Sequence, residues 1–186
     1  MRTKILAGLL ITGWLAAMLT ALWWYQGRYI RAFSDSATLF NGAELRLPAA
    51  LAGPGKIRLV HFWEPACPCN AGNQQHLAEM MQEYAAVVDF YHVQKAGTRG
   101  RLPPPLRAMR PLDDLPGMQL LPASPAVAIF DHSGDLAYFG PYSEGAVCTS
   151  SNSFIEPVLD ALQQGRRVAA ANTLAAGCFC DWNDRP

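Results

Sequence analysis

The sequence predicts an α/β fold, a central sheet flanked by helices, preceded by one transmembrane helix. Three observations carry this prediction. The stretch from Ile5 to Tyr25 contains no charged residue. A β-branched, apolar run at Ile57–Phe62 leads into an amphipathic stretch at Ala71–Val88. Further short apolar runs, separated by turn residues, precede a final helical pattern. The predicted order is an amino-terminal stub and transmembrane anchor at 1–25, a spacer at 26–55, the α/β domain at 56–165, and a cysteine-containing tail at 166–186.

Composition limits the possible classes of protein. The 186 residues, 51% of them hydrophobic, suffice for one domain with appendages. The formal net charge is zero, and basic residues form no stripe with interleaved aromatics. Nucleic acid is therefore not expected among the partners.

The amino-terminal apolar run is long enough to cross a bilayer, which takes about 20 residues. Trp23, Trp24 and Tyr25 close it like an interfacial aromatic belt. A cleavable signal peptide is the alternative, but no clean small-residue cleavage site precedes these aromatics. Arg2 and Lys4 favour a cytoplasmic start. Because disulfides persist outside the cytosol, we expect a single-pass inner-membrane protein whose soluble domain faces the periplasm.

Between the anchor and the tail, most segments are short strands and turns. The spacer is expected to hold a short strand at 44–47, and a second domain strand is expected at 87–93. Residues 97–116 contain three consecutive prolines and predict a solvated connection, with a substrate-contacting lid as the alternative. The stretch 131–135 predicts a hairpin turn into a strand at 136–139.

A last helix is indicated just before the tail. Ser153 and Glu156 have the spacing of a capping box, and Pro157 falls in the first turn, where its missing N–H is tolerated. Gly165 is expected to end this helix.

The chemistry is expected where the first domain strand ends. The chain breaks at Pro65 and places Cys67 and Cys69 at the start of the amphipathic helix. Free N–H groups and the positive end of the helix dipole stabilise a thiolate at such a position. This arrangement therefore predicts a reactive cysteine.

The same segment resembles the active site of the thioredoxin-like family. That family has a strand, Phe-Trp, three residues, and then a cysteine that opens a helix, and Phe62, Trp63 and Cys67 match this pattern. The resemblance extends over about 57–165. The sequence departs from the family in one respect: it has Cys67-Pro68-Cys69 in place of Cys-x-x-Cys, with Asn70 where the second cysteine would stand.

The resemblance implies further site residues. Ser124-Pro125 matches the family's cis-proline bond, which faces the cysteines, so the Ser124 backbone would pair with a substrate strand. Trp63 would cover the site. His61 takes the place of a buried acid or polar residue and could accept a proton from the resolving thiol, since its unperturbed pKa is about 6.5. A strand histidine bonded to the backbone is the alternative. No organic cofactor or metal is implied.

The predicted function is thiol–disulfide exchange on extracytoplasmic proteins, with protein thiols or disulfides and a redox partner protein as partners. Cys67 is the predicted nucleophile and Cys69 the preferred resolving residue. Cys148, Cys178 and Cys180 are candidates for a relay or a structural disulfide. Oxidation, reduction and isomerisation all remain open.

Two alternatives use the same cysteines. Two Cys-x-Cys pairs could bind zinc or copper(I), because thiolates suit both metals. The tail could instead be stapled to a non-catalytic thioredoxin-like interaction domain by structural disulfides.

Overall fold

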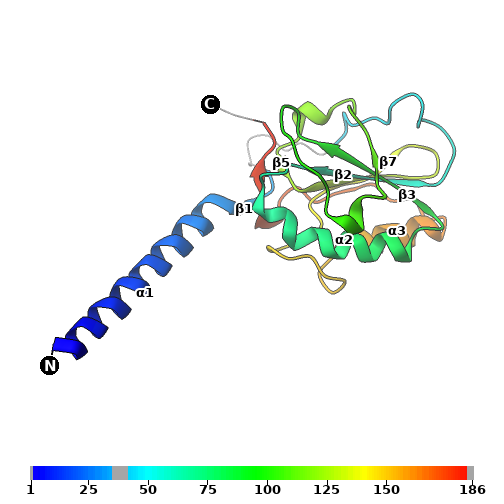
Figure 1. Ribbon diagram of the computed structural model, residues 1–186. Coiled ribbons are helices and arrows are strands. Elements are labelled where there is room, and N and C mark those ends of the chain that lie inside the picture. Colours follow the sequence, from blue (N-terminus) through cyan, green and yellow to red (C-terminus); the bar gives the residue numbers. More distant parts are fainter. Residues whose placement is uncertain (1, 35–41, 184–186) are drawn as a thin grey trace.

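A mixed six-stranded sheet forms the centre of the domain in the computed structural model, which describes residues 2–34 and 42–183 (Figure 1). The strand order is β4-β3-β2-β6-β7-β8. The strands are β2 (Ile57–Trp63), β3 (Val88–Gln94), β4 (Arg110–Pro111), β6 (Ala126–Phe130), β7 (Leu136–Gly140) and β8 (Ala170–Ala171). The short strands β1 (Ile30–Ala32) and β9 (Ala176–Cys178) pair with each other, as do β5 (Ala123–Ser124) and β10 (Cys180–Asp181).

The connections give the sheet a thioredoxin-like topology. Helix α2 (Ala71–Glu83) links the parallel neighbours β2 and β3, as the helix of a βαβ unit does. Strands β6 and β7 form an antiparallel hairpin on the other side of β2. Helix α3 (Ile155–Gln163) follows the hairpin. This strand order and these directions confirm the predicted fold.

Both helices cover the same face of the sheet (Figure 1). Side chains alternate along β2, so Ile57 and Leu59 pack beneath α2 and α3, together with Leu77 and Leu159 from these helices. The alternate residues of the strand, such as Val60 and Phe62, point to the opposite face. Every residue of β2 is buried, as expected for a strand covered on both faces.

Irregular segments cover that opposite face. Phe33, Leu45 and Leu47 from the predicted spacer lie there, and Phe179 and Trp182 from the tail join them. The short strand predicted at 44–47 is absent: Glu44 lies in a turn and the next residues follow no regular structure. Burial against the sheet holds this segment in place of strand pairing.

Two further local predictions need correction. Helix α2 ends at Glu83 rather than Val88, because the N–H groups of Val87 and Val88 turn back to the Tyr84 carbonyl. The capping box is half formed: Ser153 accepts a hydrogen bond from the Ile155 N–H at 3.1 Å. Its other member, Glu156, instead lies 2.6 Å from a ring nitrogen of His76.

The proline-containing connection at 97–116 is also less solvated than predicted. It buries Leu102, Leu106 and Met109 in the first core cluster, which is the set of apolar side chains between the sheet and the helices α2 and α3. It contains the 3-10 turn η2 (Pro104–Leu106) and the short strand β4, which pairs with β3; a further 3-10 turn, η3 (Met118–Leu120), follows it. The segment is therefore part of the packed domain.

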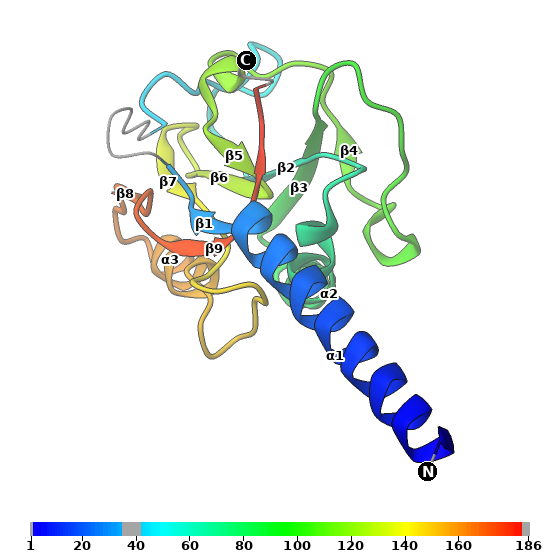
Figure 2. The same cartoon turned by 90° about the vertical axis from the view of Figure 1, so that its left-hand side faces the viewer.

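Helix α1 (Arg2–Tyr29) extends away from the domain (Figure 2). Its 28 residues span about 42 Å at 1.5 Å per residue. It is long and apolar enough to cross a membrane, a property that signal sequences near an amino terminus share. Strand β1 continues directly from α1 and pairs with β9, so the end of the helix lies against the tail.

We predict that Gly72→Ala destabilises the domain, although alanine is the better helix former. A Cβ atom at Gly72 would come within 2.0 Å of the Ala146 carbonyl oxygen, which is backbone and cannot swing away. The loop that contains Ala146 must then move away from α2, which lowers the free energy of unfolding by about 1–3 kcal/mol. Chemical unfolding followed by circular dichroism tests this. Gln82→Ala, on the exposed side of α2, is the control and should stay within about 0.5 kcal/mol of the parent chain. Equal effects of the two changes would contradict the prediction.

Candidate functional site

The Cys-x-Cys turn lies at the end of β2, where the sequence places it. The Cys67 N–H donates to the Glu64 carbonyl at 3.0 Å, which closes the turn after the strand. Cys67 then directly precedes the 3-10 turn η1 (Pro68–Asn70), which runs into α2. The first cysteine thus stands at the beginning of a helical segment, as predicted.

Both cysteines of the turn are bonded to the tail. Cys67 forms a disulfide with Cys180, and Cys69 forms one with Cys178. Cys67 and Cys69 are not bonded to each other. The resolving role of Cys69 therefore stays a prediction, and the tail cysteines are the partners that this oxidised form contains.

The tail also pairs with the strand that precedes the proline. Strand β10 runs antiparallel to β5, with Cys180 opposite Ser124 and Asp181 opposite Ala123. The Ser124–Pro125 peptide bond is cis, which confirms that expectation. The Cys67 sulfur lies 3.9 Å from the Ser124 carbonyl oxygen. The predicted site residues Cys67, Ser124 and Pro125 are thus brought together.

A groove of about 580 Å³ opens beside the first disulfide. Its walls carry charged, aromatic and cysteine side chains: Arg28, Tyr29, Glu64, Cys67, Lys95, Cys180 and Asp181, among others. Cys180 is partly exposed, whereas the other three disulfide-bonded cysteines are buried. A thiol from solution therefore has access to the Cys67–Cys180 bond before the Cys69–Cys178 bond.

The end of helix α1 packs against the second disulfide, a contact that the sequence analysis missed. The Tyr25 hydroxyl lies 3.5 Å from the Cys178 sulfur. The Phe179 N–H donates to the Tyr29 carbonyl at 2.9 Å. The Tyr29 side chain packs against the cysteine cluster, which consists of the four disulfide-bonded cysteines: Cys67, Cys69, Cys178 and Cys180. The last turns of α1 thus form one wall of the site.

His61 is fully buried on β2, beneath the helices. The Tyr142 hydroxyl lies 2.9 Å from its Nδ1, and its Nε2 is buried as well. Burial, and to a lesser extent the nearby His92, lower the pKa of His61 to about 3. The imidazole is therefore neutral near pH 7 and a weak base. Its role as proton acceptor remains a prediction.

Trp63 lies in the first core cluster rather than beside the groove. Its indole N–H donates to His92 Nδ1 at 3.3 Å. It lines a separate cavity of about 320 Å³ together with Leu102 and Arg107. The role of Trp63 as a cover for the cysteines therefore stays a prediction.

Cys148 is buried and unbonded, in the first core cluster and apart from the other four cysteines. Its N–H donates to the Gly72 carbonyl at 2.8 Å. Burial raises the pKa of its thiol to about 11, although hydrogen bonds with Ser143 and Ser153 act in the opposite direction. Such a thiol is a poor nucleophile near neutrality.

The sulfur atoms of Cys67, Cys69 and Cys180 lie within 4.8 Å of one another. Sulfurs this close can exchange disulfide partners. In the reduced state the same cluster would offer thiolates to a soft metal ion such as zinc. The arrangement therefore supports thiol–disulfide chemistry and keeps the metal alternative open.

One sequence signal could have indicated this pairing. The turn and the tail each have a Cys-x-Cys pair with the same spacing, at 67 and 69 and at 178 and 180. Two segments with equal spacing can form two disulfides side by side. The contacts of Tyr25 and Tyr142 leave no comparable signal, because they depend on how distant segments pack.

We predict that His61 makes stability fall as the pH falls below about 6.5. The unfolded chain binds a proton on this histidine near pH 6.5, whereas the folded chain does so only near pH 3. Within this window the unfolded state binds more protons, which lowers the free energy of unfolding by about 1.4 kcal/mol per pH unit. Urea unfolding from pH 4 to 7 should show a shallower slope for His61→Gln than for the exposed-site control His132→Gln. Identical slopes in the two variants would refute the assignment.

Residues 36–182 match the family model described as "Domain of unknown function (DUF6436)". No curated protein matches.

Several solved structures are similar at low identity. Mycobacterial ("MTB") dsbF, solved in mixed oxidised and reduced forms, is 18% identical, with a TM-score of 0.43 over 59% of this chain and 82% of its own. A hypothetical protein from Sinorhizobium meliloti 1021 is 16% identical, with a TM-score of 0.49 over 84% of this chain and 100% of its own. A thioredoxin-like protein in its oxidised form is 16% identical, with a TM-score of 0.46 over 75% of this chain and 98% of its own. The family match covers most of the chain, and this protein belongs to the DUF6436 family.

Proposed function

We propose that this protein carries out thiol–disulfide exchange on extracytoplasmic proteins, with Cys67 as the nucleophile. One observation carries the proposal: Cys67 begins a helical segment and forms, with Cys180, a disulfide that borders an open groove. The helix start favours the thiolate form of a cysteine, which is both a good leaving group and a nucleophile.

The exchange balances in electrons and protons. A substrate thiolate attacks the Cys67 sulfur, the bond to Cys180 breaks, and Cys180 leaves as a thiolate. A second substrate thiol, once deprotonated, attacks the substrate sulfur of this mixed disulfide and releases the Cys67 thiolate. The substrate loses two electrons to the protein as it forms a disulfide. Run backwards, the same steps reduce a substrate disulfide.

The other cysteines have distinct roles in this proposal. The Cys69 sulfur lies within 4.8 Å of both Cys67 and Cys180, so it is within reach of either sulfur once their bond opens. Cys69 and Cys178 would then serve as a second redox pair, resolving or reloading the first. His61, neutral because of its low pKa, would accept a proton only transiently.

We also propose that helix α1 is an uncleaved inner-membrane anchor and that the domain faces the periplasm. The length and apolar character of α1 support an anchor. Two disulfides support a compartment in which disulfides persist. The division into anchor, spacer, thioredoxin-like domain and tail at residues 25, 55 and 165 belongs to this proposal. A redox partner protein would restore the resting state after each turnover.

We predict that Cys67→Ser abolishes exchange, because no other cysteine combines a helix start with access to the groove. The full-length protein in detergent would be mixed with a reduced, unfolded dithiol protein, and disulfide formation followed by thiol trapping and mass spectrometry. The matched control is Cys148→Ser, which removes the buried thiol outside the cluster and should keep the parent rate. Full exchange activity of Cys67→Ser would overturn the assignment of Cys67 as the nucleophile, and no exchange by the parent protein would support a non-catalytic domain with structural disulfides.

We predict an ordered reduction of the two disulfides. Cys180 is partly exposed, whereas the Cys69–Cys178 bond is buried and covered by Tyr25. Stepwise reduction with a dithiol, quenched by alkylation, should therefore label Cys67 and Cys180 before Cys69 and Cys178. Tyr25→Ala should speed labelling of the second pair without changing the first. Simultaneous labelling of all four would contradict the prediction.

A thiolate metal site is the second candidate function, and the closeness of three cysteine sulfurs favours it. Zinc would bind only after both disulfides are reduced, because each sulfur offers a thiolate only then. Metal analysis of protein purified under reducing conditions tests this candidate. Stoichiometric zinc that is lost on replacing both Cys-x-Cys pairs would favour it over exchange.

A further inference from the structure

The tail lies on the edge of β5 as a short antiparallel strand and is bonded covalently to Cys67. We propose that residues 180–183 occupy the position in which a substrate binds. Their sequence then indicates the preferred substrate, which is an extended protein segment with a cysteine, then an acidic residue, then an aromatic one. This inference rests on the proposed function and adds the substrate class. Each tail side chain supports it in turn.

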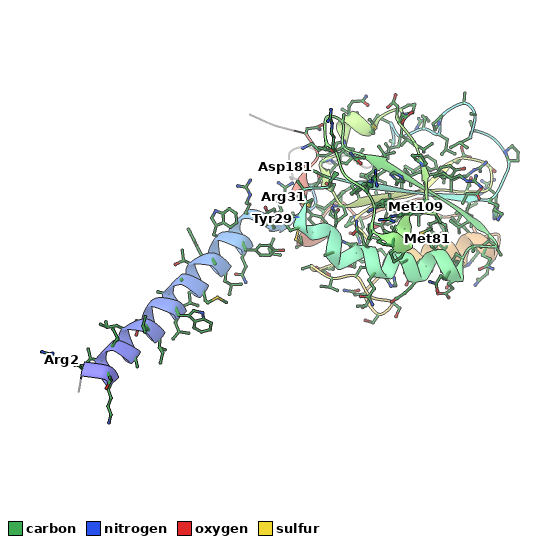
Figure 3. All side chains as sticks on the ribbon, in the orientation of Figure 1. Arg2, Tyr29, Arg31, Met81, Met109 and Asp181 are labelled. Atoms are coloured by element: carbon green, nitrogen blue, oxygen red, sulfur yellow. A yellow bond between two sulfur atoms is a disulfide. The ribbon has the colours of Figure 1, made fainter. Side chains whose placement is uncertain are left out.

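Arg31, on β1, recognises the acidic side chain of the segment through an ion pair. The Arg31 guanidinium lies 2.7 Å from the Asp181 carboxylate, directly after the bonded cysteine. Figure 3 labels both residues beside Tyr29, where the end of α1 meets the domain. A substrate segment that replaced β10 on β5 would place its next residue opposite Ala123, as Asp181 is placed now. An acidic side chain there would restore the ion pair.

The aromatic side chain binds in the second core cluster, which is the set of apolar side chains on the helix-free face of the sheet. Trp182 is only 5% exposed, and its ring packs edge-on against Phe62, with centroids 5.9 Å apart. The next residue, Asn183, donates its side-chain N–H to the carbonyl oxygens of Gln119 and Leu121, at 2.9 and 3.2 Å. Since strand pairing covers only two residues, the buried indole is a main non-covalent anchor of the segment. The Phe179 ring, which is 3% exposed and packs against Phe33, holds the chain just before it.

The tail can leave this position without leaving the domain. Its upstream part is held separately, by the Cys69–Cys178 disulfide and by the pairing of β9 with β1. Residues 180–183 can therefore detach once the Cys67–Cys180 bond opens. The groove beside Cys67, Cys180 and Asp181 provides the approach for an incoming chain.

The exchange step is balanced. The substrate cysteine attacks the Cys67 sulfur as a thiolate, a new sulfur–sulfur bond forms, and Cys180 departs as a thiolate with the electron pair of the broken bond. The substrate strand then takes the edge of β5 that β10 vacates, as in other cases of strand addition. Arg31 and Phe62 now contact the substrate in place of the tail.

Synthetic peptides test this substrate preference in the full-length protein. The variant Cys69→Ser/Cys178→Ser/Cys180→Ser leaves Cys67 as the reactive thiol and the buried Cys148 as the other. The variant Cys180→Ser alone keeps the second disulfide and serves if the triple variant does not fold. Each peptide carries its cysteine as a mixed disulfide with thionitrobenzoate. Cys67 attacks the peptide sulfur and releases thionitrobenzoate, which is followed by absorbance.

The peptide Phe-Cys-Asp-Trp-Asn should react fastest. Replacing its aspartate with lysine should slow the reaction about fivefold, the range of a partly exposed ion pair. Replacing its tryptophan with alanine should slow the reaction about tenfold. In an added Arg31→Glu background the lysine peptide should become the faster of the two charged peptides. A tail that stays bound non-covalently would slow all peptides alike and leave these ratios unchanged.

The outcomes separate the two proposals. Equal rates for all peptides, together with normal reaction of Cys67 with the small symmetric disulfide of thionitrobenzoate, would overturn the substrate preference and leave exchange intact. No reaction of Cys67 with either the peptides or the small disulfide would overturn the proposed function itself. A charge preference that persists unchanged in Arg31→Glu would also overturn the assignment of Arg31.

Discussion

The two disulfides between the Cys-x-Cys turn and the tail are the constraint on which the rest of the site depends. They join residues 113 and 109 positions apart, and so connect the start of the helical segment to the last two described strands, β10 and β9. Loops of about 100 residues are those for which such a bond is expected to stabilise most, about 4.7 kcal/mol in the chain-entropy model. The two disulfides hold the tail against the helix-free face of the sheet, where the side chains of Phe179 and Trp182 cover the core.

Much of the domain could be predicted because its signals are local. The buried strand Ile57–Trp63, the helix after it and the hairpin all follow from periodicity and turn residues within short windows. The sheet order required the thioredoxin resemblance. The pairing of β10 with β5 could not be predicted, since a two-residue strand has no periodicity and its partner lies far away in sequence. Only the matched cysteine spacing hinted at it.

The positions of the site residues along the chain were easier to predict than the contacts that these residues make in the fold. His61 was identified from its place before Phe-Trp, but its full burial and its contact with Tyr142 depend on a loop 81 residues away. Glu156 shows the same limit: its spacing from Ser153 predicted a cap, yet the folded chain offers it His76 instead. When a side chain has two possible partners, the packing of the folded chain determines which of them it contacts. No local sequence pattern contains this information.

The contact between Tyr25 and Cys178 has a consequence for how partners meet this protein. With α1 across a bilayer, as we propose, Tyr25 belongs to the aromatic group that closes the apolar run, and the cysteine cluster lies at the depth of the lipid headgroups. A partner anchored in the same membrane then searches for the cluster in two dimensions rather than three. Its reactive group must also lie close to the lipid surface, since a cysteine held far above the membrane would pass over the site.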